Sequence, residues 1–515
     1  MRSTFMGLET SKRGLFTQQT ALYTTGHNIS NANTLGYSRQ RVNLQATPGF
    51  PTAGLNQPIY PGHLGTGVEA GSIQRIRDEF IDRQYRQETN KLGYWDSTAK
   101  SIAQMEDIMS EPSEFGINQS FTDFWKSMED VIDNPKDAAA RQVLIAKGKS
   151  IAESFNYMDR QQKLIQGNIG NEIKVSTDKV NSILKQIAAI NKQIQEVEPS
   201  GYVPNDLYDA RDLLVDELNE NIPVSISMQK SGGLAKDVAE GSMTITYVPA
   251  DGSAPIKLVD GREYAALATM DTNNQRVDGE VDEQATGGYF EFKEIKISAV
   301  GEPPADPATG PHKIDYSQMD PGKGTIRALI DAYGHSGGQG TYPEMVANLD
   351  NLANEFITEF NKIHRAGVGL DNSTGIDFFS GTTARDFKVE ITDPKQVAVS
   401  DTAGEEGNNQ NMRKLAELQK QAQANLKQGT FQSYYKSLVG DLAVKGQEAE
   451  RSAFNSKTLH LQISNNRDSM SSVSLDEEMT NMITFQQAYN ANARMITVVD
   501  ETLDKIINGM GRVGL

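Results

Sequence analysis

Apolar residues recur every seven positions near the end of the chain, a spacing that keeps one side of a helix apolar. The helix is predicted to begin at Leu475, because Ser474 can cap it and Glu477 stands at the capping-box position. The apolar side is too wide for one partner helix to cover. Its central stripe is Leu475, Met482, Tyr489, Ile496, Leu503 and Met510, flanked by Met479, Ala493 and Ile507 on one side and by Phe485, Val499 and Ile506 on the other.

A second seven-residue stripe lies near the start of the chain, at Leu8, Leu15, Leu22 and Ile29. Residues 1–44 carry five Lys and Arg against one Glu, whereas residues 465–515 carry four bases and seven acids. The two ends therefore have opposite net charge. We expect the two terminal helices to pair as a coiled coil. The alternative is that each stripe packs inside its own domain, as most amphipathic helices do.

A basic, amphipathic N-terminus is also typical of a targeting peptide or a membrane-surface helix. However, the chain has no apolar run of the roughly 7 to 15 residues that a secretory signal requires. It also has no stretch approaching the ~20 residues that span a bilayer. We therefore expect no membrane insertion and, if the protein leaves the cytoplasm, export without a cleaved signal peptide.

Between its ends the chain changes from helical to strand-like patterning and back again. Apolar spacings of three, four and seven predict long helices from residue 80 to residue 198. Residues 224–300 instead hold strand-like runs such as MTITYV, separated by turns rich in Gly, Pro and Asp. The predicted fold is therefore mainly α with an inserted β domain. The expected aromatic core anchors are Trp95, Phe121, Phe124 and Trp125.

These patterns predict three domains. Residues 1–45 and 465–515 would form the terminal coiled coil, and residues 46–223 and 324–464 a discontinuous bundle of long helices. Residues 224–323 would form a β-rich outer domain, which should face solvent because residues 231–323 carry sixteen acids and eight bases. We expect removal of residues 226–322 to spare the helical core.

Groups suited to catalysis or to metal binding are sparse. The chain has no Cys, and its six His show no HExxH spacing. The glycine-rich run at 334–341 lacks the Lys-Ser/Thr pair of a phosphate loop. The acids at 476–478 and at Asp206, Asp209 and Asp212 are interpreted as solvated or helix-dipole groups, with calcium binding as the weaker alternative. A net charge of −18 argues against nucleic-acid binding. We predict no enzyme activity, cofactor or metal.

Two sequence motifs at opposite ends of the chain resemble the signatures of one family, the bacterial flagellar rod, hook and hook-associated proteins. The N-terminal motif is NISNANTLGYSRQ, which contains Asn31, Asn33, Gly36 and Tyr37. The C-terminal motif is SLDEEMTNMITFQQAYNANARMI. Internal stretches at 204–218, 352–381 and 407–418 resemble the hook-associated members, so the resemblance spans nearly the whole chain.

The resemblance implies an extracellular structural subunit that self-assembles into a ring between hook and filament. Its implied partners are further copies of the chain, the hook protein, a second hook-associated junction protein toward the filament, the flagellar export apparatus, and an export chaperone at the C-terminal region. Its assembly interface would comprise the N-terminal stripe, the central stripe of the C-terminal helix with Met479 and Phe485, and the four residues of the N-terminal motif named above. The alternatives are a hook or rod protein and, outside the family, a secreted adhesin or enzyme carried on the β insert.

Overall fold

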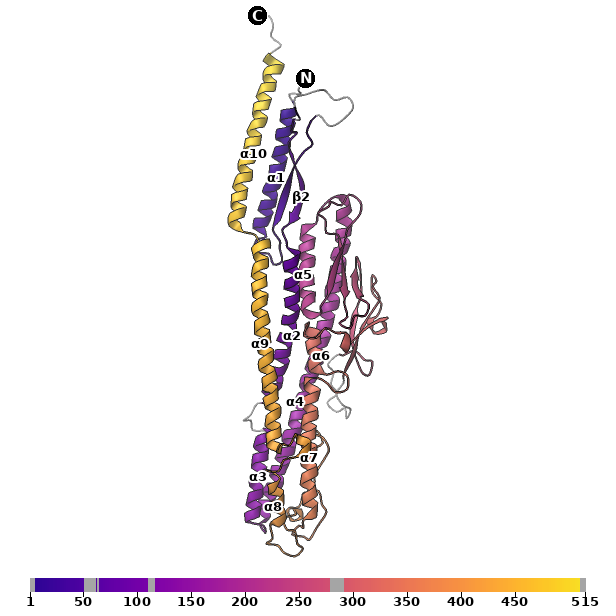
Figure 1. Ribbon diagram of the computed structural model, residues 1–515, viewed down its shortest axis with the longest axis vertical. Helices are drawn as coiled ribbons and strands as arrows, with labels where there is room; N and C mark the ends of the chain where they lie inside the picture. Colours follow the sequence, from indigo (N-terminus) through magenta and orange to yellow (C-terminus); the bar gives the residue numbers. More distant parts are fainter. Residues whose placement is uncertain (1–4, 51–61, 63, 110–115, 278–290, 510–515) are drawn as a thin grey trace.

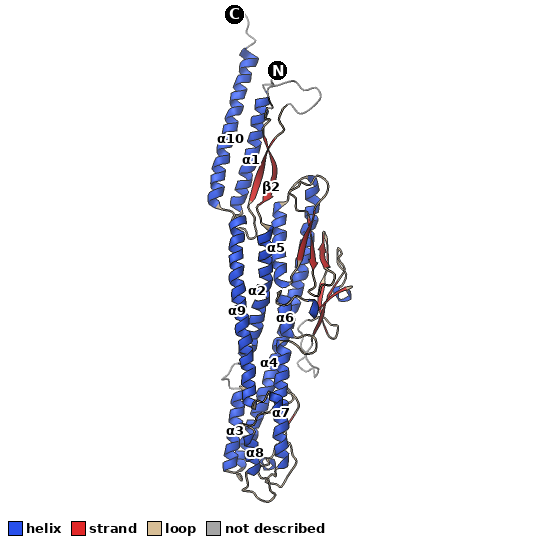
Figure 2. Ribbon diagram, viewed as in Figure 1, coloured by secondary structure: helices blue, strands red, loops and turns tan. Residues whose placement is uncertain are grey.

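The computed structural model describes residues 5–50, 62, 64–109, 116–277 and 291–509. The chain forms a long rod, and both of its termini lie at the same end of that rod (Figure 1). Long helices build the shaft, and short β-sheets project from one of its sides (Figure 2). This arrangement confirms the predicted fold class, mainly α with an inserted β-rich part.

The helices of the described residues are α1 (Phe5–Ser30), α2 (Glu79–Met109), α3 (Ile117–Asp133), α4 (Ala138–Val197), α5 (Asn205–Asn221), α6 (Thr325–Tyr333), α7 (Thr341–Ala366), α8 (Gln410–Glu417), α9 (Phe431–Ser471) and α10 (Leu475–Asp504). The strands are β1 (Gln40–Ala46), β2 (Val68–Arg75), β3 (Ser225–Gln229), β4 (Ser242–Tyr247), β5 (Ile256–Asp260), β6 (Glu263–Tyr264), β7 (Leu267–Asp271), β8 (Phe292–Ile297), β9 (His312–Asp315), β10 (Phe379–Ser380) and β11 (Lys388–Val389). The expected domain boundary at residue 465 falls inside α9.

Helix α4 runs along the shaft, and its 60 residues correspond to a length of about 90 Å. The carboxylate of Asp137 caps its first turn by accepting a hydrogen bond from the Ala139 N–H. Pro135 precedes the helix and Pro199 follows it, so no proline interrupts it. Buried residues recur at spacings of three and four along its length, which lets α4 pack against several neighbours in turn.

Aromatic side chains fill the core where α3, α4 and α7 meet, at the end of the rod opposite the termini. The Phe121 and Phe356 rings meet edge to face with their centroids 5.0 Å apart. Phe124 and Trp125 are buried beside them, as the sequence predicted. Trp95, the remaining predicted anchor, is only partly buried.

His364 on α7 is a buried, neutral imidazole in this part of the shaft. Its Nε2 accepts the Ala398 N–H at 3.0 Å, so the proton sits on Nδ1, which donates to the Ile376 carbonyl at 2.8 Å. Burial lowers the pKa of His364 to about 4. Protonation would therefore remove a hydrogen-bond acceptor and place a charge in the core.

We expect His364 to make the shaft sensitive to mild acid. Between an unfolded pKa of about 6.5 and the folded value of about 4, the unfolded chain binds a proton that the folded chain excludes. Stability should therefore fall as the pH is lowered, by about 2 kcal/mol between pH 7.5 and pH 5. Urea unfolding at the two pH values measures this. His364→Gln should show a smaller pH-dependent loss than the wild type, whereas His312→Gln, at an exposed position, should not.

The β insert consists of two antiparallel sheets, ordered β3-β4-β5-β6 and β7-β8-β9, which lie against α4 (Figure 2). The buried Asn191 side chain of α4 donates to the Met243 and Gly261 carbonyls at 2.8 and 2.9 Å, and it accepts the Met243 N–H. The Asn181 side chain likewise donates to the Leu267 carbonyl and accepts the Leu267 N–H. The insert is therefore fastened to the shaft by side chains of α4.

The structure argues against the expectation that removal of residues 226–322 spares the helical core. Leu184 lies on the face of α4 that carries Asn181 and Asn191, and it belongs to the same apolar core as Ile245 and Leu258 of the insert. Deletion would expose such residues at ~1.5–3 kcal/mol each. We expect the shortened chain to lose helical circular dichroism and protease resistance over residues 138–221. Leu234→Ser, at an exposed position in the insert, is the control and should change neither.

Candidate assembly surface and charged joint

Helices α1 and α10 lie side by side and run antiparallel at the end of the rod that carries both termini (Figure 1). Gly7 faces Val499, Gly14 faces Asn492, and the Asn28 side chain donates to Glu478 at 3.1 Å. The contact is close, because a Cβ atom at Gly14 would lie 2.9 Å from the Asn492 Oδ1. The predicted pairing of the terminal helices is thus present, and its contact positions are spaced by multiples of seven residues on both helices.

The part of α1 that meets α10 differs from the one the leucine stripe predicted. The contact stripe consists of small or polar residues seven apart, Gly7, Gly14, Ala21 and Asn28. Leu8, Leu15, Leu22 and Ile29 stand one position further, rotated by about 100° around the helix, and are only half-buried. Small side chains are favoured at the contact because they let two helix backbones approach closely. The leucine stripe therefore borders the contact and remains available to another partner.

On α10 the contact with α1 runs through Glu478, Asn492 and Val499, so the predicted central stripe lies beside this contact and is incompletely covered. The half-buried residues include Met482, Phe485, Tyr489, Ile496 and Leu503, whereas the only fully buried residue of the helix is Glu478. Leu475 and Met479 are 49% and 56% exposed, so they do not belong to the contact with α1. Met510 lies outside the described residues.

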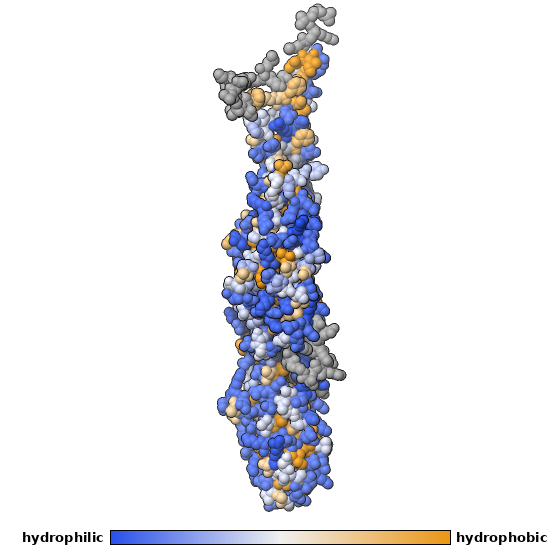
Figure 3. All heavy atoms as spheres, turned by 90° about the vertical axis from the view of Figure 1, so that its right-hand side faces the viewer, coloured by the Kyte–Doolittle hydropathy of each residue, from blue (hydrophilic) through white to orange (hydrophobic). Residues whose placement is uncertain are grey.

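Large apolar side chains are exposed on both terminal helices, on sides that face away from their mutual contact. Figure 3 shows apolar residues near the end of the rod that carries the termini. Burying such side chains against another molecule would be favourable, because each would lose contact with water. Besides Leu475 and Met479, the exposed set is Phe5, Phe16 and Tyr23 on α1, and Ile483, Met495 and Val498 on α10, followed by Ile506 and Ile507.

The N-terminal motif forms a compact turn that connects α1 to β1. The Asn28 side chain holds it together, because its Oδ1 accepts the Tyr37 hydroxyl at 2.8 Å and the Gln40 N–H at 3.0 Å. The Asn31 side chain accepts the Thr34 hydroxyl at 3.1 Å. Gly36 adopts a φ of +79°, a conformation that favours glycine.

Burial, together with nearby Asp206 and Asp209, raises the pKa of Tyr37, so its hydroxyl remains a hydrogen-bond donor. Asn33 is exposed and is not part of the hydrogen-bonded turn that Asn28 and Asn31 hold together. Of the four predicted motif residues, the structure thus gives Asn31, Gly36 and Tyr37 a local structural role.

Arg39 ties this turn to the start of α10. Its guanidinium contacts Glu477 at 2.6 Å and Glu478 at 2.7 Å, and its backbone N–H donates to the Ser471 carbonyl. Glu478 is buried, with a side chain only 3% exposed. The expectation that Glu478 is solvated is therefore wrong, although Glu478 does lie in the first turn of α10, where the helix dipole favours an acid.

Beneath the terminal helices, arginines and acids from distant parts of the chain form one cluster. Asp212 of α5 contacts Arg75 at 2.9 Å, Arg77 at 2.8 Å and Arg86 at 3.3 Å. Arg467 of α9 reaches Asp82 of α2 at 3.0 Å. We call this cluster the charged joint, and it consists of Arg75, Arg77, Arg86, Arg211 and Arg467 with Asp82, Asp209, Asp212, Asp216 and Glu240.

The centre of the charged joint is largely withheld from water, although Glu240 at its edge is 31% exposed. Asp209 and Asp212 have side chains 8% and 7% exposed, so the interpretation of these two acids as solvated groups is also wrong. Asp206, whose side chain is 68% exposed, does fit that interpretation. Burial alone would raise the pKa of Asp212, but Arg77, Arg75 and Arg86 together hold it well below its ordinary value. The joint therefore keeps its charges at neutral pH and links α2, α5, α9, β2 and the insert.

The described residues offer little for chemistry. Among them, no group of three or more His, Asp or Glu side chains is placed to hold a metal ion. Within the same residues, no helix is long and apolar enough to cross a membrane. What the structure does present is a rod whose paired terminal helices expose apolar side chains. That architecture is typical of a structural subunit, and the two motifs at its terminal end resemble those of flagellar axial proteins.

Comparison with known proteins specifies the family. A family model described as the flagellar hook-associated protein FlgK helical domain matches residues 102–379, more than half of the chain. The C-terminal model of flagellar basal body rod FlgEFG proteins matches residues 465–509. The chain is 40% identical to flagellar hook-associated protein 1 of Bacillus subtilis, over 99% of each chain. It is 26% identical to the Escherichia coli protein of that name, over 96% of this chain and 98% of the other.

A solved structure has the same fold. The flagellar hook junction protein FlgK from Burkholderia pseudomallei superposes with a TM-score of 0.59 at 14% identity, covering 76% of this chain and all of the other. The chain belongs to the flagellar hook-associated protein 1 family and is a structural protein of the bacterial flagellum. The alternative of a hook or rod protein is not supported, because the model shared with those proteins covers only residues 465–509.

Proposed function

We propose that the chain forms a closed ring at the junction of hook and filament, through the paired helices α1 and α10. One observation carries this proposal: the pair uses small residues for its internal contact and leaves Leu22, Phe16 and Val498 partly or largely exposed. A pair with different apolar surfaces on α1 and α10 favours head-to-tail contacts, which close into a ring when the rotation between copies allows it.

Such a ring has two faces, and each face would contact a different partner. The ring would contact the hook protein on one side and a second hook-associated junction protein on the other, outside the cell. The subunit would pass through the flagellar export apparatus without a cleaved signal peptide. An export chaperone would cover the C-terminal region beforehand, because α10 leaves residues such as Met479 and Ile483 more than half exposed.

We further propose that the chain is organised as terminal pair, helical shaft and β insert, with expected bounds of 1–45 and 465–515, 46–223 and 324–464, and 224–323. The break between α9 and α10 at residues 472–474 supports a separate terminal pair, although it lies seven residues beyond the expected bound at 465. In the isolated monomer the terminal pair should be the part that proteases remove first, since its apolar surfaces lack partners. Uniform resistance of both ends in a proven monomer would contradict this.

Complementation tests the proposed function. A flagellated bacterium that lacks its own hook-associated protein 1 and carries this chain should swim and retain its filaments. Without the chain, filament subunits should be lost to the medium, because nothing joins them to the hook. If the chain is exported and stable but filament subunits are still lost, the chain does not form the junction.

A further inference from the structure

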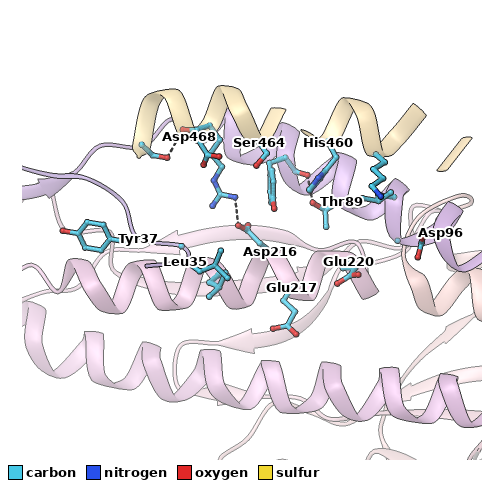
Figure 4. Close-up of a pocket in the computed structure, with 18 of the residues that line it drawn as sticks. Leu35, Tyr37, Thr89, Asp96, Asp216, Glu217, Glu220, His460, Ser464 and Asp468 are labelled. Atoms are coloured by element: carbon cyan, nitrogen blue, oxygen red, sulfur yellow. Dashed lines mark hydrogen bonds and ion pairs between the residues drawn. The ribbon is translucent and has the colours of Figure 1, made fainter. Parts of the chain in front are cut away.

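A long groove runs along the shaft just below the terminal pair. Helix α2 forms its floor, with α5 on one wall and α9 on the other, and the motif turn at residues 32–38 closes one end. Glu172 of α4 and Thr325 and Leu329 of α6 also line it. Figure 4 shows His460, Ser464 and Asp468 of α9 across the groove from Glu217 and Glu220 of α5. The groove has a volume of about 1250 Å³.

The shape of the groove suits a helix. Residues of α2 from Tyr85 to Lys100 line the floor, and they span about 22 Å at 1.5 Å per residue. Three helices that surround a groove of this length leave the position that a fourth helix occupies in a four-helix bundle. A helical segment of roughly fifteen residues would fill it, and one of twelve would occupy most of its length.

The lining of the groove combines apolar and acidic side chains. Leu213 is 38% exposed and Leu35, at the tip of the motif turn, is 83% exposed, while Leu92 is half-buried in the floor. Acids outnumber bases around them, and one pair, Asp216 with Arg467, belongs to the charged joint. The acids are Asp96, Glu172, Asp216, Glu217, Glu220 and Asp468, and the bases are Lys100, Lys457 and Arg467.

One segment of the chain matches this lining. Residues 12–23 of α1 contain two bases, Lys12 and Arg13, and no acid. Lys12, Phe16 and Tyr23 share the face of α1 turned away from α10, and the two aromatic side chains are 55% and 78% exposed. Within its own chain this face does not lie in the groove, because α1 is paired with α10 and the β1-β2 hairpin at the end of the rod.

We propose that the groove between α2, α5 and α9 receives residues 12–23 of α1 from a second copy of the chain. This inference rests on the proposed function and specifies which surfaces meet in the ring. The contact joins two different surfaces, so neighbouring copies are displaced along their long axes and each copy offers one α1 and one groove. It buries Phe16 and Tyr23 against the leucines of the groove and brings Lys12 toward its acids.

Engineered cysteines test the contact directly, because the chain has no Cys of its own. Gln19 lies on the same face as Phe16 and Tyr23, and Ser464 lines the α9 wall. A chain carrying both Gln19→Cys and Ser464→Cys should give a ladder of disulfide-linked multimers in oxidised hook–filament junctions isolated from motile cells. Neither single variant should give a ladder. Gln19→Cys combined with Val143→Cys, an exposed residue near the α3 end of the shaft, is the matched control and should not either.

The outcomes separate this inference from the proposed function. Junctions that form and keep their filaments but give no ladder would overturn the groove contact alone. If wild-type chain forms no junction, the proposed function fails and the inference fails with it. As a second measurement, Lys12→Glu in the double-Cys chain should lower the yield of linked multimers about two- to fivefold, as loss of an exposed ion pair would. Adding Asp468→Lys should restore the yield.

Discussion

Asp212→Ala is expected to lower the free energy of unfolding by about 3–5 kcal/mol, because it leaves buried guanidinium groups without their shared carboxylate. Asp212 contacts Arg75, Arg77 and Arg86 within 3.3 Å, and its side chain is 7% exposed. Removing one member of such a cluster is costly even where replacing the whole cluster with apolar residues would not be. Urea unfolding at pH 7, followed by circular dichroism, measures the loss.

The matched control for this variant is Glu217→Gln on the same helix. Glu217 pairs with Lys179 at 3.0 Å, but its side chain is 43% exposed, so its loss should cost less than about 1 kcal/mol. Equal stability of the Asp212→Ala protein and the wild type would show that the charged joint does not hold α5 to α2 and β2.

The Asp212 carboxylate should also affect how the stability of the protein depends on pH in the acid range. Its folded pKa lies below its unfolded value, so its stabilising contribution is present above an unfolded pKa of about 3.9 and is lost as the pH falls toward the folded value. The wild type should therefore lose this stabilisation only below about pH 4, well below the range in which His364 acts. Asp212→Ala should remove that acid-range loss and leave the loss between pH 7.5 and pH 5 in place.

The sequence predicts helices and strands well because they depend on apolar spacing, which is visible in one dimension. The long helix α4 and the strand β4 follow from it, whereas α10 begins at Leu475 as predicted although the Ser474 side chain makes no cap hydrogen bond. The contact face of α1 does not, since Gly7, Gly14 and Asn28 have little hydropathy and the neighbouring leucines dominate the pattern. The seven-residue spacing of these small or polar residues on α1 is the signal that could have identified the contact face.

The sequence pattern did not predict the charged joint, for a different reason. Single charges on helices are usually solvated, and sequence gives no direct sign that Arg75 and Arg467 converge on the same acids. One signal was present, because Asp209, Asp212 and Asp216 follow each other at spacings of three and four and so form a continuous acidic stripe on α5. Such a stripe on a helix that must also pack needs bases opposite it, and the arginines of β2, α2 and α9 supply them.

The terminal pair leads to the prediction with the largest effect on function. Leu22→Asp should abolish motility while leaving the melting temperature of the monomer nearly unchanged, because Leu22 is half-buried and lies outside the contact stripe of α1. In a ring, loss of ~1.5–3 kcal/mol of burial repeats in every subunit, and an unpaired carboxylate adds a desolvation cost. Filament subunits should then be lost to the medium although the subunit is still made and exported.

Ile496→Asp separates the contact within the chain from the contact between chains. Ile496 is half-buried beside the contact of α10 with α1, so its replacement should weaken the terminal pair in the monomer as well as abolish motility. Proteolysis of the purified monomer should therefore remove residues 475–509 faster from Ile496→Asp than from Leu22→Asp. Two controls accompany these variants: Asp500→Asn, at an exposed position that interrupts the stripe, and Leu234→Asp, which places the same charge on an exposed leucine of the insert. Both should swim normally. If Leu22→Asp and Ile496→Asp cells also swim and keep their filaments, the stripes of α1 and α10 do not form the assembly surface, and the ring must be held by another part of the rod.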